Sequence, residues 1–62
     1  MSPSLSQLIE IVLTLSAMDS WGIEGINAYR DVNFPGVDIT RLRPAMLKKA
    51  AELAKAVQDE RQ

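Results

Sequence analysis

The segment from Asp31 to Gly36 has the residue types and spacing that come closest to a metal site. Asp31, Asn33 and Gly36 fall on the first, third and sixth positions of a calcium-binding EF-hand loop. Pro35, however, stands where that loop needs a ligand, and Leu42 is the twelfth residue where a bidentate glutamate is required. The segment therefore indicates an Asx and Pro-Gly turn, and we expect no metal and no other cofactor.

Catalytic side chains are scarce in this chain of 62 residues. It has no cysteine and no histidine, which removes thiolate chemistry, disulfides and the commonest general base and zinc ligand. A serine activated by a lysine is the nucleophilic pair that the composition leaves open, but so short a chain has little room to enclose a substrate pocket. We expect the protein not to be an enzyme.

A row of cations in the last third of the chain suggests contact with phosphates. Arg41, Lys48 and Lys55 recur at intervals of seven residues, and Lys49 flanks them. On a helix they would form a basic ridge about 20 Å long. Glu52 interrupts that ridge, and the net charge of the chain is −1. A solvated helix face is the favoured interpretation, and a nucleic-acid-binding regulator is the alternative.

An apolar helix expected from Leu5 to Met18 organises the rest of the chain. At about 100° per residue its large apolar side chains cover an arc of about 220°, twice the width that an ordinary surface helix needs. One neighbouring helix cannot cover that arc, so a second copy of the chain is the expected partner. The predicted homodimer interface consists of Leu8, Ile11, Val12 and Leu15.

Local signals place the start of this helix between Pro3 and Leu5. The segment from Ser4 to Gln7 fits a capping box, and the alternative has Ser2 as the N-cap with Pro3 at the first helical position. Further along, the hydroxyl of Ser16 can bond back to the carbonyl of Val12.

A second, shorter helix is expected to begin at an N-cap formed by Asp19 or Ser20 and to reach Tyr29 or Arg30. Trp21 lies at this joint, where closing one end of the core is favoured over serving as an exposed anchor.

A linker follows this short helix, and its Pro-Gly pair predicts a type II turn. Phe34, Val37 and Ile39 are expected to fold back onto the helices.

The last helix is expected to start at a cap formed by Asp38 or Thr40 and to run to about Gln58 or beyond. Pro44 is compatible with a start near Thr40 to Arg43, because it then falls in or next to the first turn, whereas a start at Ile39 would imply a kink. The helix is amphipathic. Its apolar face comprises Leu42, Met46, Leu47, Ala50, Leu53, Ala54 and Val57.

Charge and hydropathy suggest no role at a membrane. Residues 1–29 carry three anions and no cation, whereas residues 30–62 carry seven cations and five anions. The apolar run is about 14 residues long, shorter than the roughly 20 that a bilayer requires. No targeting segment is recognisable, so the expected location is the cytoplasm.

Together these patterns predict a single all-α domain over residues 1–62, with two main helices and a short middle helix, that forms a helical homodimer. The expected function is that of a small non-enzymatic protein-binding regulator, adaptor or inhibitor. Aromatic residues and arginine concentrate in the middle of the chain, as they do in protein interfaces. The predicted surface for an unidentified protein partner is Trp21, Tyr29, Arg30 and Phe34.

Overall fold

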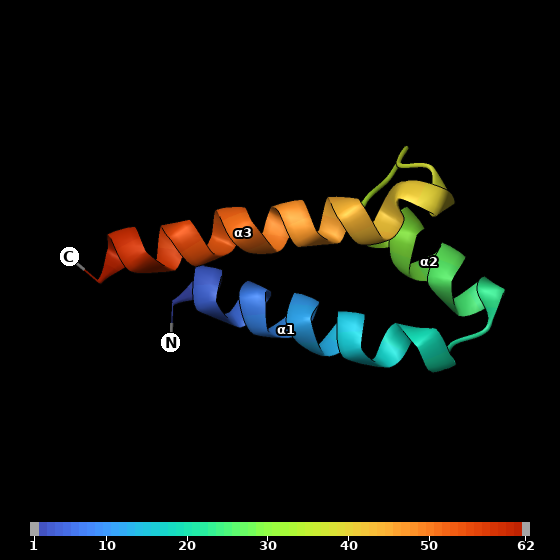
Figure 1. The fold of residues 1–62 in the computed structure, drawn as a ribbon, viewed down its shortest axis with the longest axis horizontal. Coiled ribbons are helices and arrows are strands. Elements are labelled where there is room, and N and C mark those ends of the chain that lie inside the picture. The colour runs from blue at the N-terminus through green and yellow to red at the C-terminus, as the bar shows by residue number, and fades with distance from the viewer. Residues whose placement is uncertain (1, 62) are drawn as a thin grey trace.

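The protein is a helical hairpin with a third helix across one end. The computed structural model describes residues 2–61, and these form α1 (Pro3–Ala17), α2 (Ile23–Asn33) and α3 (Leu42–Glu60). The helices α1 and α3 lie side by side and antiparallel, with α2 at the end opposite the two termini (Figure 1). Two short 3-10 helices, η1 (Met18–Ser20) and η2 (Ile39–Arg41), precede α2 and α3. The predicted all-α fold, with two main helices and a shorter middle one, is confirmed.

The start of α1 follows the second of the two capping alternatives. The Ser2 hydroxyl accepts a hydrogen bond from the Leu5 amide at 3.1 Å, and Pro3 is the first helical residue. Ser4 is inside the helix, where its hydroxyl donates to Glu60 Oε1 at 3.0 Å and ties α1 to the end of α3. The bond from Ser16 Oγ to the Val12 carbonyl is present at 2.9 Å, as predicted.

The predicted cap of α2 is wrong, because η1 extends the first helix before the chain turns. Asp19 and Ser20 lie in η1, where Asp19 pairs with Arg43 and the Ser20 hydroxyl donates to the Ala17 carbonyl. Gly22 occupies the N-cap of α2 without a side-chain bond. The helix also runs three residues past Arg30, to Asn33.

The Pro-Gly turn forms as predicted. The Val37 amide donates to the Phe34 carbonyl at 3.1 Å, and Gly36 has φ of +85°, which is the geometry of a type II turn. The predicted cap of the last helix needs correction, because Asp38 caps η2 by accepting from the Thr40 amide at 2.9 Å. The helix α3 begins only at Leu42, and its N-cap, Arg41, makes no side-chain capping bond.

The core is small and lies between α1, η1 and α3. Its buried side chains are Ile11, Met18, Leu42, Met46 and Leu53. Half-buried side chains pack around them: Leu8, Leu15, Trp21, Ile26, Tyr29, Phe34, Ile39 and Ala50. Phe34 and Ile39 therefore fold back onto the helices as expected. Over residues 2–61, no helix combines the length and apolar character needed to cross a bilayer.

Candidate functional site

A row of three aromatic rings joins α2 and the following turn to the hairpin. The Trp21 and Tyr29 rings meet edge to face with centroids 6.0 Å apart, and the Tyr29 and Phe34 rings lie tilted at 6.1 Å. All three side chains are half-buried against the core. Such aromatic pairs add about 0.5–1.5 kcal/mol beyond the apolar area that they bury. The row therefore holds α2 in place and exposes only part of each ring.

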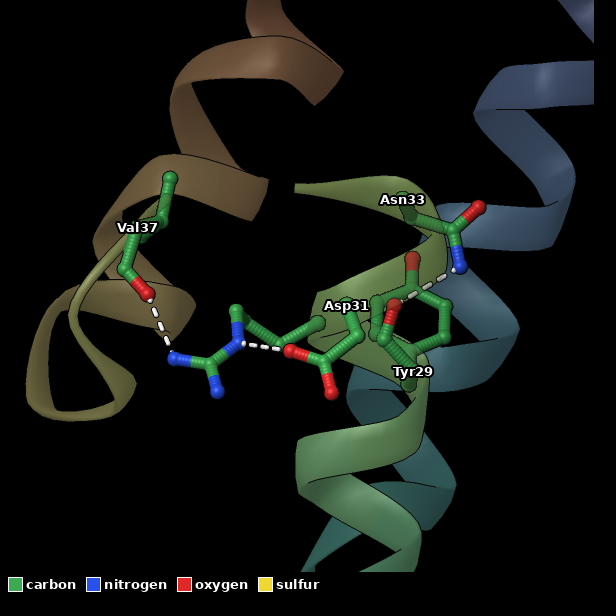
Figure 2. Close-up of polar contacts among 5 residues, drawn as sticks. Tyr29, Asp31, Asn33 and Val37 are labelled. Atoms are coloured by element: carbon green, nitrogen blue, oxygen red, sulfur yellow. Dashed lines mark hydrogen bonds and ion pairs between the residues drawn. The ribbon is translucent and has the colours of Figure 1, made fainter. Parts of the chain in front are cut away.

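Arg30, the fourth residue of the predicted partner surface, fastens the linker to α2. Its Nη1 donates to the Val37 carbonyl at 2.8 Å and its Nε to Asp31 Oδ1 at 2.8 Å. Figure 2 shows these two bonds, together with the bond from Asn33 Nδ2 to the Tyr29 carbonyl at 2.9 Å. The guanidinium is thus engaged within the protein, and its side chain is 24% exposed.

A shallow apolar depression opens between the exposed edges of Trp21 and Tyr29. Gly22 and Gly25 also line it. A Cβ atom at Gly25 would lie 3.7 Å from Trp21 Cβ, an ordinary contact, and at Gly22 it would meet nothing within 4 Å. The two glycines therefore leave room for the end of an apolar side chain from another molecule.

The depression continues onto an apolar stripe of α2 that sequence reasoning missed. Gly25, Ala28, Tyr29 and Val32 recur at i, i+3, i+4 and i+7, the spacing of one helix face. Val32 is 80% exposed, and α2 contains no buried residue. We name the set Trp21, Gly25, Ala28, Tyr29 and Val32 the α2 surface. The helical spacing of this stripe is present in the sequence, but Gly25 and Ala28 are too small to stand out as apolar positions.

A cleft of about 580 Å³ lies on the other side of Tyr29, between α1, α2 and α3. Glu10, Lys49 and Asn33 stand at its edge, and Ile11 and Leu53 contribute apolar surface. Burial raises the pKa of the Tyr29 phenol, Glu10 adds to that rise, and a hydrogen bond with Thr14 opposes it.

The four cations predicted for nucleic-acid binding are all exposed. Arg41 and Lys48 line a groove beside Asp38 and the Pro-Gly turn, whereas Lys49 lies at the cleft between the three helices. Lys55 is exposed further along α3. Binding of nucleic acid remains a prediction. Acidic side chains lie near these cations, with Asp38 at the groove of Arg41 and Lys48 and Glu10 at the cleft of Lys49.

The residues predicted for the dimer interface divide between core and surface. Ile11 is only 7% exposed and belongs to the protomer's own core, and Leu8 and Leu15 pack half-buried against it. Val12 is 48% exposed, and its larger apolar neighbours Ile9 and Leu13 are 40% and 63% exposed. The accessible part of α1 is therefore centred on Ile9, Val12 and Leu13.

The segment that resembles an EF-hand loop is largely helical. Asp31 and Asn33 lie in the last turn of α2, and their side chains bond to Arg30 and to the Tyr29 carbonyl. Within residues 2–61, no three acidic side chains come together in a way that could hold a metal ion.

Comparison of the chain with protein-family models, with curated proteins and with solved structures gives no match. The candidate surface must therefore be interpreted from its own chemistry.

Proposed function

We propose that this chain is a small non-enzymatic protein-binding domain that acts as a regulator, adaptor or inhibitor, and that it works as a homodimer. The α2 surface receives the partner. An apolar or aromatic side chain of the partner enters the depression between Trp21 and Tyr29, and a neighbouring apolar side chain packs on Val32.

The observation that carries this proposal is the α2 surface itself. No residue of α2 is fully buried, although Ile26 and Tyr29 pack half-buried against the core. The outer edges of Trp21 and Tyr29 and the 80% exposed Val32 offer apolar area that the protein does not use for its own core. Aromatic edges around a small apolar hollow are the features of residues that dominate binding energy in protein interfaces. Arg30 fastens the linker to α2 through its bond to the Val37 carbonyl, and we do not include it in the proposed contact.

Panning of a random peptide library on the immobilised protein tests the proposal without knowledge of the natural partner. We expect enriched peptides that share an aromatic or aliphatic anchor and shift amide resonances of residues 21–32. The Gly25→Leu variant fills the depression, and we expect it to weaken peptide binding about tenfold or more, equivalent to about 1.4 kcal/mol.

Glu24→Leu is the matched control, because it adds the same side chain one residue earlier, outside the depression. Both variants should keep the helical content of the wild type, since leucine is a good helix former. The proposal fails if no peptide is enriched, or if the selected peptides bind the Gly25→Leu variant as tightly as the wild type.

A further inference from the structure

The side of α2 that faces away from the core carries two exposed carboxylates, Glu24 and Asp31. At about 100° per residue they lie about 40° and 60° around the helix from Ala28, the outermost helical position of the α2 surface. Both lie roughly 150° around the helix from Ile26, which packs against the core. The two carboxylates therefore border the α2 surface along its solvent side, and we name the pair the acidic edge.

The acidic edge is only partly neutralised by the protein's own cations. Arg30 donates to one oxygen of Asp31, whose side chain is nevertheless 66% exposed (Figure 2). The other ion pair within residues 2–61 joins Arg43 to Asp19, so Glu24 is paired with no cation in this part of the chain. The remaining described cations lie on η2, on α3 and at the end of α3: Arg41, Lys48, Lys49, Lys55 and Arg61.

We propose that the partner segment received by the α2 surface is basic. Its apolar or aromatic anchor enters the depression, and Lys or Arg side chains next to that anchor contact the acidic edge. Glu24 and Asp31 are seven residues apart, about 10 Å along the helix axis, so two cations at a similar spacing reach both carboxylates. The inference rests on the proposed function, because it names the chemistry of the partner that binds the same surface.

The charge of the acidic edge favours this occupant over other binders of an exposed apolar surface. Opposite charges at the rim of an interface steer the partner and select it against wrong ones, which is the role that two exposed carboxylates beside an apolar hollow can fill. An anionic lipid surface and the phosphates of a nucleic acid carry the same sign of charge as the acidic edge and are repelled by it.

The charges of the peptides enriched by panning test the inference. At about 0.15 M salt, which screens charges more than about 8 Å apart, we expect the enriched peptides to contain more Lys and Arg than the unselected library. Peptides that share an apolar anchor but show no excess of Lys or Arg would overturn this inference and leave the proposed function standing. The absence of any enriched peptide would overturn both.

The contact itself is tested with the most enriched peptide, synthesised in a basic form and in a form with glutamine in place of each Lys and Arg. Glu24→Gln should weaken binding of the basic form about twofold to fivefold, the size expected for one exposed charge pair. Asp31→Asn should have a smaller effect, because Arg30 already bonds to one of its oxygens. Titrations followed by the amide resonances of residues 21–32 measure the dissociation constants.

Two comparisons separate the acidic edge from other causes. Neither variant should change binding of the glutamine form, and raising the salt from about 0.05 M to about 0.5 M should remove most of the advantage of the basic form. The glutamine form is also the peptide with which Gly25→Leu and Glu24→Leu are compared, since Glu24 makes no charge contact with it.

The matched control for the double variant Glu24→Gln/Asp31→Asn is Glu52→Gln/Asp59→Asn. It removes two exposed carboxylates of α3 and changes the net charge by the same amount. We expect the double variant of α2 to lose most of the preference for the basic form and the α3 variant to retain it. Circular dichroism should show the helical content of the wild type in both.

The inference fails if the basic form binds the double variant of α2 as tightly as the wild type. It also fails if the α3 variant weakens binding equally, because the attraction would then come from the net charge. Binding of phosphatidylglycerol vesicles by the α2 surface would assign it to a lipid instead. A shift of the amide resonances of residues 21–32 with protein concentration alone would assign it to a second copy of the chain.

Discussion

The hairpin of α1 and α3 supplies four of the five buried side chains found in residues 2–61, whereas α2 supplies none. The hairpin is held by packing between two long helices. The shorter α2 is held by half-buried aromatic edges and by the bond from Arg30 to the Val37 carbonyl. Elements with few buried contacts open at lower free energy than the core.

Under the proposed function, this difference gives the hairpin and α2 separate roles. The hairpin would keep its fold while α2 adjusts to the proposed partner, because few contacts that stabilise the hairpin depend on the outer face of α2. The same difference predicts where a substitution will unfold the protein and where it will affect only binding.

The largest contrast should come from truncating one buried and one exposed side chain. Met46 is fully buried, and Met46→Ala should lower the free energy of unfolding by about 2–5 kcal/mol. Val32→Ala on α2 should change it by less than about 0.5 kcal/mol. Urea unfolding followed by circular dichroism at equal protein concentration measures both. Equal losses in the two variants would mean that α2 is part of the cooperative core.

Arg30→Ala tests how the linker is attached to α2. It removes a partly exposed charged hydrogen bond to Val37, and we expect a loss of about 1 kcal/mol. Hydrogen exchange should accelerate at residues 37–41 and stay slow in the middle of α3. Asp31→Ala, which removes only the exposed partner, should cost less than about 0.5 kcal/mol. Uniform acceleration along the chain would contradict a separately held linker.

Much of the fold was predictable from periodicity and turn chemistry. The 3.6-residue pattern gives α1 and α3, the Pro-Gly pair gives the turn at Gly36, and Pro44 marks the first turn of α3. The caps of α2 and α3 were not predictable, because short 3-10 helices took up Asp19, Ser20 and Asp38. Neighbouring Asp and Ser side chains can each hydrogen-bond to several nearby backbone groups, and tertiary packing determines which of these hydrogen bonds forms.

The candidate surface was predictable only in part. The width of the apolar arc of α1 indicates that α1 packs against more than one neighbouring helix, but the sequence does not say which residues face α3. Ile11 and Val12 are therefore both predicted to lie at the dimer interface, although only Ile11 is buried in the protomer. Aromatic content identified Trp21 and Tyr29. Val32 was missed because Gly25 and Ala28, which extend its stripe, are too small to register as apolar positions.

Alanine substitutions at Gly25 of α2 and at Gly36 of the linker should change the free energy of unfolding by smaller amounts and in opposite directions. Gly25→Ala should raise the free energy of unfolding by about 0.5–1 kcal/mol, because alanine favours a helix and its Cβ makes an ordinary contact with Trp21. Gly36→Ala should lower it by about 1–2 kcal/mol, because φ of +85° is strained for alanine. Thermal unfolding measures both signs. A loss of stability in Gly25→Ala would mean that this part of α2 is more tightly packed than its glycine suggests.

The smallest predicted effect concerns Tyr29, the residue that connects α2 to the cleft of the hairpin. Its pKa is raised above the ordinary value of 10.0, first by burial and then by Glu10. The folded state therefore holds the phenolic proton more tightly than the unfolded state. The resulting stability is fully present below pH 10.0 and is lost as the pH rises through the pKa of the folded protein.

Because Tyr29 is the only tyrosine, phenolate absorbance measures this pKa directly. Glu10→Gln should lower it, since a nearby negative charge is removed, and Thr14→Val should raise it, since a hydrogen bond that favours the phenolate is lost. Shifts of opposite sign would show that α2 rests against α1 through this ring. If both variants leave the pKa unchanged, Tyr29 does not lie beside α1 in solution. The helix α2 would then make fewer contacts with the hairpin than the row of three aromatic rings indicates.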